Sequence, residues 1–132
     1  MGARLLAALV GSAVLLGGVA HAHHSFSAEF DADKPVELTG IVTKIEWKNP
    51  HVWFFIDVTE DDGEVTSWGW EMGSPNGLMR RGWTRNSMKI GDVISVEGSL
   101  AKDGSSRANA RVVLLAASGQ RLFAASSQGQ TP

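Results

Sequence analysis

The sequence contains no cysteine, and this absence excludes several kinds of chemistry at once. A chain without thiols has no disulfide, no thiolate nucleophile, no lipid-modified cysteine and no thiolate metal site. A domain of this length has a hydrophobic core large enough to be stable without such cross-links. We therefore predict a single domain that is stabilised by packing alone.

An excess of positive charge is also lacking. The chain has 12 Lys and Arg residues against 14 Asp and Glu residues, which gives a formal net charge of −2. Affinity for nucleic acid comes largely from the neutralisation of phosphates by Lys and Arg. We therefore expect no nucleic-acid partner, and we expect an envelope protein or a small ligand instead.

No catalytic signature is present in the sequence. Acid–base catalysis uses paired carboxylates or a histidine in a cleft. The candidate acids and bases occur at no spacing typical of such a pair: Glu46, His51, Asp57 and Glu71. A Ser-centred elbow and a glycine-rich phosphate loop are missing as well. We predict a protein that is not an enzyme.

The first 22 residues have the pattern of a secretory signal peptide. Arg4 supplies a positive start, residues 5–19 form an apolar run, and Ala20-His21-Ala22 is a small-x-small cleavage site. A membrane anchor is the alternative, but the run is near the lower limit of about 20 residues for a spanning helix and contains glycines. We predict export to the periplasm, cleavage after Ala20 or Ala22, and no membrane span after cleavage. Loss of Arg4 would bring the net charge to −3.

Residues 36–123 consist of short alternating runs separated by turn signals. Asp62-Gly63 and Asp103-Gly104 are typical of hairpins, and Ser74-Pro75 is typical of a helix start. We predict strands at residues 36–47, 51–59, 65–72, 93–100 and 108–115, and a short helix at residues 75–81. This is the element order of an OB-fold, a five-stranded, partly open barrel. The alternative is a small antiparallel sandwich or meander.

The first of these strands changes its alternation part-way along. Val36 and Leu38 share one phase, whereas Ile41 and Ile45 share the other, and the change follows Gly40. A one-residue slip at a glycine predicts a β-bulge, which would bend a long strand around a curved sheet.

Polar segments flank the predicted barrel. Residues 23–35 are acidic with isolated phenylalanines, and we predict an arm on the surface, with Pro35 at the start of the first strand. Residues 124–132 have too little apolar surface to offset the entropy of ordering, which predicts a disordered tail.

Four sequence motifs resemble those of an uncharacterised family of short exported bacterial proteins, one of the families known as domains of unknown function. The motifs are HHSF at residues 23–26, NPHVW at residues 49–53, GSPNGLMRRGW at residues 73–83 and GDVISVEG at residues 91–98. The resemblance covers nearly all of the chain after the signal peptide except the tail. It implies secretion and a small β-barrel-like domain, and it implies no established activity, substrate or cofactor.

Aromatic residues concentrate around the second and third predicted strands, which form the usual ligand platform of an OB-fold. In the second strand, one face is apolar and should point inward: Val52, Phe54, Ile56 and Val58. Exposed rings on the other face would stack on a ligand, although the same rings would also serve to fill a small barrel. The candidate ligand-binding residues are Trp47, Asn49, His51, Trp53, Phe55, Trp70 and Glu71.

Histidines near the predicted cleavage site suggest a metal site as the alternative function. Cleavage after Ala22 would leave His23 with a free amine and an imidazole, beside His24, and His51 would complete a copper site similar to the histidine brace. Cleavage after Ala20 would place His23 third, as in amino-terminal copper and nickel motifs. Cu(II) is thus the one cofactor suggested. The other interpretation is a solvated terminus and a strand-end histidine bonded to a neighbour.

The reach of the arm limits the predicted copper site. From His23 to Val36 the chain spans at most about 43 Å, and a straight first strand would place His51 about 36 Å from Val36. The arm would therefore have to be almost fully stretched unless the strand curls strongly.

Overall fold

The computed structural model describes residues 26–126 of the chain. A helical turn at residues 26–29 is followed by six strands and one short helix. In chain order these are β1 (Phe30–Glu46), β2 (Trp53–Thr59), β3 (Val65–Glu71), α2 (Pro75–Arg80), β4 (Val93–Ala101), β5 (Arg107–Leu115) and β6 (Arg121–Phe123). The predicted signal peptide, His23, His24 and residues 127–132 lie outside the described residues.

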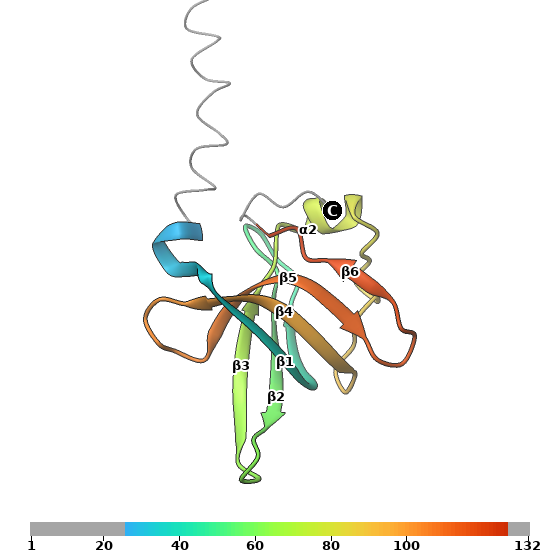
Figure 1. The fold of residues 1–132 in the computed structure, drawn as a ribbon. Coiled ribbons are helices and arrows are strands. Elements are labelled where there is room, and N and C mark those ends of the chain that lie inside the picture. Colours follow the sequence, from blue (N-terminus) through green and yellow to red (C-terminus); the bar gives the residue numbers. More distant parts are fainter. Residues whose placement is uncertain (1–25, 127–132) are drawn as a thin grey trace, which may run out of the picture.

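The strands form a sheet that closes on itself (Figure 1). Its order is β3-β2-β1-β4-β5-β6, and β3 pairs in addition with β5, in parallel, which joins the two sides of the sheet. Closure leaves few unpaired strand edges. The predicted OB-fold is confirmed, and the alternative of a sandwich or meander is wrong because β3 and β5 are paired.

Strand β1 is long enough to pair with two neighbours. Its first part, through Ile41, pairs with β4, and the part from Ile41 onward pairs with β2. The bulge predicted at Gly40 lies instead between Val42 and Lys44. Ile41 is accordingly 51% exposed, whereas Val42 is buried.

Gly40 has a different role, because the backbone of β2 approaches it closely. A Cβ atom at Gly40 would lie 2.5 Å from the carbonyl oxygen of Asp57. A bulge and a close approach both interrupt an apolar alternation at a glycine, so the pattern alone does not distinguish them.

The first strand also begins earlier than predicted, at Phe30 rather than at Pro35. Phe26 and Phe30 are buried and form a small second cluster with Ala101. The two phenylalanines are isolated in the sequence, and their partners come from distant strands. Part of the predicted surface arm is therefore packed.

The C-terminal end of the barrel extends beyond the predicted strands. Strand β6 was not predicted, and it pairs with β5. Ala124, predicted to begin the tail, is fully buried. Packing thus continues past Phe123.

The barrel interior is apolar, as the alternation in the second strand predicts. Val52, Phe54 and Ile56 have no exposed surface, and Val58 is also buried. Phe54 and Trp70 stack in parallel, with ring centroids 6.3 Å apart. The predicted inward face is confirmed.

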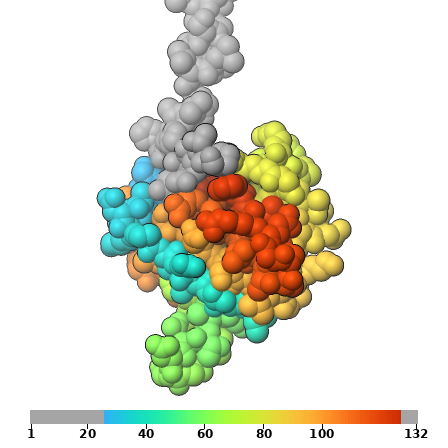
Figure 2. Space-filling view, turned by 45° about the vertical axis from the view of Figure 1, so that its right-hand side comes forward, coloured from blue at the N-terminus to red at the C-terminus, as the bar shows by residue number. Residues whose placement is uncertain are grey.

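Helix α2 covers one end of the barrel (Figure 1). The Gly77 amide donates a hydrogen bond to Ser74 Oγ at 3.1 Å, so Ser74 caps the helix as its sequence predicts. Leu78 is the buried residue of the helix. At the other end, the tip of the β2–β3 hairpin projects from the body of the molecule (Figure 2). Within residues 26–126, no helix is long and apolar enough to cross a membrane.

Candidate ligand-binding face

The outer side of β2 and β3 carries aromatic rings that are only half-buried. Because Phe54 points into the barrel, Trp53 and Phe55 point outward, opposite Glu71 and Gly69 on β3. A Cβ atom at Gly69 would lie 3.1 Å from a ring carbon of Phe55. The Phe55 ring therefore covers the backbone of β3, in space that a larger residue would fill.

Arg107 joins this surface from β5, which pairs with β3. Its guanidinium lies 4.8 Å from the centroid of the Trp53 ring, and one of its nitrogens lies 3.9 Å from a carboxylate oxygen of Glu29. A cation–π contact at an exposed site contributes about 0.5–1 kcal/mol. Trp53 also packs against the cluster of Phe26, Phe30 and Ala101. The ring is thus held by Arg107 and by the N-terminal turn.

Glu71 is a buried carboxylate on this outer side, with 9% of its surface exposed. Its Oε1 accepts a hydrogen bond from Asn109 Nδ2 at 3.1 Å, and Ser126 Oγ donates to Asn109 Oδ1. Burial, as the largest cause, raises the pKa of Glu71, and nearby Glu29 raises it further, whereas His51, Asn109 and Arg107 act in the opposite direction.

His51 is half-buried at the start of the same side of the hairpin. Its Nδ1 lies 3.1 Å from the carbonyl oxygen of Met72. A carbonyl only accepts hydrogen bonds, so Nδ1 carries the proton and Nε2 is the acceptor nitrogen of the neutral ring. His51 thus fits the strand-end interpretation, and its Nε2 lone pair is suited to bind a donor or a metal.

The structure separates the predicted ligand-binding residues into two groups. His51, Trp53, Phe55 and Glu71 lie together on the outer side of the barrel, and with Arg107 they are called the ligand face below. The other predicted residues lie elsewhere: Trp47 packs against the main core, Asn49 is exposed in the turn before Pro50, and Trp70 has no exposed surface.

Trp70 was wrongly predicted to contact a ligand. The alternation of β3 places Trp70 inward, against Phe54, while its neighbour Glu71 points outward. Adjacent residues of a strand lie on opposite faces, so Trp70 and Glu71 do not line the same surface.

Sequence reasoning missed the residues that reach the ligand face from other elements. Arg107 and Asn109 come from β5, and Phe26 and Glu29 come from the N-terminal turn. The polar residues of β5 alternate with buried Ala108, and this period-2 pattern was available in the sequence. Its relation to β3 depends on the parallel pairing of two strands that are distant in the chain.

The predicted copper site is only partly represented in the described structure. Among residues 26–126, no three His, Asp or Glu side chains are placed so that they would hold a metal ion. His51 is described, whereas His23 and His24 lie outside the described residues.

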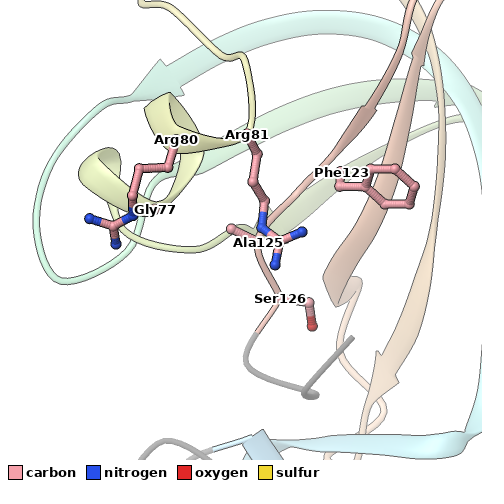
Figure 3. A pocket seen from close by; sticks show the side chains of 6 residues that line it. All are labelled: Gly77, Arg80, Arg81, Phe123, Ala125 and Ser126. Carbon is pink, nitrogen blue, oxygen red and sulfur yellow. The ribbon is translucent and has the colours of Figure 1, made fainter. Parts of the chain in front are cut away.

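A groove of about 720 Å³ lies between α2 and the C-terminal segment. Figure 3 shows Arg81 extending toward Ala125, while the guanidinium of Arg80 points to another side. The two arginines therefore do not converge on a single anion, and the groove contains none of the residues of the ligand face.

A family model matches residues 12–110, which is most of the chain. The chain belongs to DUF6152, a family of unknown function. The predicted membership of an uncharacterised family is confirmed. No curated protein matches the chain.

Among solved structures, the mitochondrial single-stranded DNA binding protein Rim1 of S. cerevisiae is similar in fold. The match covers 63% of this chain and 93% of that protein, with 10% sequence identity and a TM-score of 0.50. At this identity the similarity concerns the fold alone, and it agrees with the OB-fold architecture.

Proposed function

We propose that this protein is an exported, non-catalytic binding module of the periplasm that binds its ligand or protein partner on the ligand face. One observation carries the proposal: Glu71 is a buried carboxylate on the outer side of the barrel, among half-buried rings. Burying a carboxylate costs free energy, and the apolar interior of the barrel does not require it. Such a group is typical of a site that binds something.

The composition of the ligand face supports binding by stacking and hydrogen bonding. Trp53 and Phe55 offer ring surfaces, Glu71 and His51 offer polar groups, and Arg107 offers a cation. The outer side of β2 and β3 is also the ligand platform of many OB-folds. Export is supported by the signal-peptide pattern of residues 1–22.

A nucleic-acid ligand is less well supported, although the similar yeast protein is described as binding single-stranded DNA. Acidic side chains border the rings of this chain: Glu71 lies opposite Trp53 on β3, and Glu46 lies opposite it on β1. With a net charge of −2, the chain has little capacity to neutralise phosphates. A small ligand or an envelope protein suits this face better.

Site-specific photocrosslinking in the envelope tests the proposal. A benzophenone amino acid replaces Phe55 on the ligand face or, as a matched control, Leu114, an exposed apolar residue of β5. Intact-mass spectrometry of the purified protein then detects protein and small-molecule adducts alike. We expect a discrete adduct from position 55 alone, and its loss when Trp53→Ala is added without a change in the circular dichroism spectrum. The same adducts from both positions, or none from position 55, would contradict the proposal.

A second candidate function is copper binding by the mature N-terminus, and one observation favours it. The turn at residues 26–29 folds back, so that Phe26 packs in the cluster against Trp53, two positions after His51. An almost fully stretched arm is then unnecessary for the mature N-terminus to reach His51. The limit on its reach assumed a chain that extends away from Pro35. The Nε2 lone pair of His51 is suited to Cu(II).

The copper candidate is tested on the secreted protein. Mass spectrometry fixes the cleavage site, and Cu(II) titration followed by electron paramagnetic resonance compares three proteins: the processed chain, the same chain extended by one N-terminal alanine, and His51→Ala. We expect both altered proteins to bind Cu(II) at least about tenfold more weakly, which corresponds to about 1.4 kcal/mol. Equal affinity of the processed and extended chains would exclude an amine ligand and reject this function.

A further inference from the structure

The N-terminal turn already occupies part of the ligand face with a defined set of contacts. We define the N-terminal clip as residues 26–30. Phe26 and Phe30 are 6% and 2% exposed, their ring centroids are 5.8 Å apart, and with Ala101 they pack against Trp53. This cluster is separate from the core of the barrel. The apolar part of the clip therefore rests on the outer surface of the barrel.

The polar contacts of the clip are made by basic residues of β5 and the β4–β5 hairpin. Glu29 pairs with Arg107 at 3.9 Å, and the Lys102 amide donates to the Glu29 carbonyl oxygen at 2.8 Å. Lys102 Nζ also donates to the carbonyl oxygen of Ser27. Together these groups hold a turn of the chain that carries aromatic side chains and a carboxylate.

A groove of about 460 Å³ adjoins these contacts. It is lined by the clip residues Ala28, Glu29 and Phe30 and by Ala101, Lys102, Asp103 and Arg107. Space for additional side chains thus exists beside the clip, next to the two cations that hold it.

The segment that joins the clip to the barrel is irregular. The pairing of β1 with β4 shifts register between Phe30 and Pro35, and residues 32–35 are exposed. A segment with few buried contacts opens locally at a low free-energy cost. The contacts of the clip thus lie apart from those that close the barrel.

From these contacts we infer that the ligand is a peptide segment of a partner protein with a phenylalanine and a carboxylate spaced as in the clip, and that this segment displaces the clip. The inference rests on the proposed function and adds the chemical class of the ligand. In the free protein the clip competes with the partner segment. The apparent affinity for this segment is therefore the intrinsic affinity multiplied by the fraction of molecules in which the clip is open.

The test uses the full processed chain and a fluorescent synthetic peptide with the sequence of residues 25–33, measured by fluorescence anisotropy. Glu29→Lys places a cation against Arg107 and Lys102 and should open the clip without removing a core residue. Phe26→Ala is a second opening variant. Glu37→Lys, the same charge change at an exposed position of β1, is the matched control.

We expect both opening variants to bind the peptide at least about tenfold more tightly than the unaltered chain and Glu37→Lys. Replacing the phenylalanines of the peptide with alanine should abolish binding. Absence of saturable binding to both opening variants, with unchanged circular dichroism spectra, would overturn the inference. A dimer of these variants in light scattering, in place of peptide binding, would also overturn it, because a second copy would then supply the segment. If position 55 crosslinks to a partner while neither opening variant binds the peptide, the proposed function is supported and the inferred class of ligand is rejected.

Discussion

The two faces of the β2–β3 hairpin use the same residue types for different purposes. On the inner face, Phe54 and Trp70 are stacked and have no exposed surface. On the outer face, Trp53 and Phe55 are half-buried and lie beside a buried carboxylate, Glu71. The inner rings are held by close packing within a closed barrel, whereas Trp53 on the outer face is covered by Arg107 and by the N-terminal clip.

This difference shows that an aromatic residue is assigned to core or surface by its position in the alternation rather than by its type. A side chain enclosed on all sides contributes mainly to stability, because its removal leaves a cavity. A side chain that is only half-buried contributes less to stability and has surface available to a ligand. Substitutions at matched pairs of positions separate these two cases.

The largest effect is expected for Phe54→Ala. Removal of this ring leaves a cavity beside Trp70 and should lower the free energy of unfolding by about 3–5 kcal/mol. Phe55→Ala, the matched change on the outer face, should cost about 1 kcal/mol because the ring is already half in water. Urea denaturation measures both. Equal losses would show that the two faces do not differ in packing.

A smaller effect is expected at the bulge of β1, for Val42→Ala. Val42 is 1% exposed, and loss of its methyl groups should cost about 2 kcal/mol. Its neighbour Ile41 is 51% exposed, and Ile41→Ala should change stability by about 0.5 kcal/mol or less. Thermal unfolding of the two variants checks the position of the bulge. A larger loss of stability for Ile41→Ala than for Val42→Ala would indicate that the bulge lies at Gly40.

The smallest effect is expected for Glu71→Gln, and it depends on pH. The pKa of Glu71 is raised in the folded state, so its contribution to stability is fully present below the ordinary value of 4.5 and is lost as the pH rises through the raised pKa. Gln still accepts the hydrogen bond from Asn109 and does not ionise. The free energy of unfolding of the variant, relative to that of the unaltered protein, should therefore increase as the pH rises. Each unit of difference in the pKa between the folded and unfolded states corresponds to about 1.4 kcal/mol.

Glu46→Gln is the control of opposite sign. The hydrogen bond from Lys44 is the main cause that lowers the pKa of Glu46, so its contribution is present above 4.5 and is lost as the pH falls. This side chain is exposed, and its effect should be slight. Urea denaturation at several pH values measures both variants, and slopes of the same sign would reject the assigned burial of Glu71.

Much of the fold was predictable because its signals are local. The Ser74 cap, the Asp-Gly turns and the inward set headed by Phe54 all depend on residues close together in the chain, and all were confirmed. Among the predictions that failed, the burial of Phe26 and Phe30 depends on contacts with distant strands. Two others failed although their contacts are local or start from a local pattern: the bulge lies at Val42–Lys44 rather than at Gly40, and β6 pairs with the neighbouring β5.

The candidate site was predicted only in part. His51, Trp53 and Phe55 share one strand end, and period-2 alternation was enough to place them on one face. Trp70 lies inside the barrel and not on this face, because alternation places the adjacent residues Trp70 and Glu71 on opposite sides of β3.

The sequence by itself determined the barrel class, the inner face of the hairpin and the family to which the chain belongs, because capping, turn chemistry and alternation act between near neighbours. Only the tertiary structure decided which groups surround Trp53. The parallel pairing of β3 with β5 brings Arg107 and Asn109 to this face, and the folded-back clip brings Glu29. These contacts join segments far apart in the chain, and no local periodicity records which distant strands become neighbours when a sheet closes.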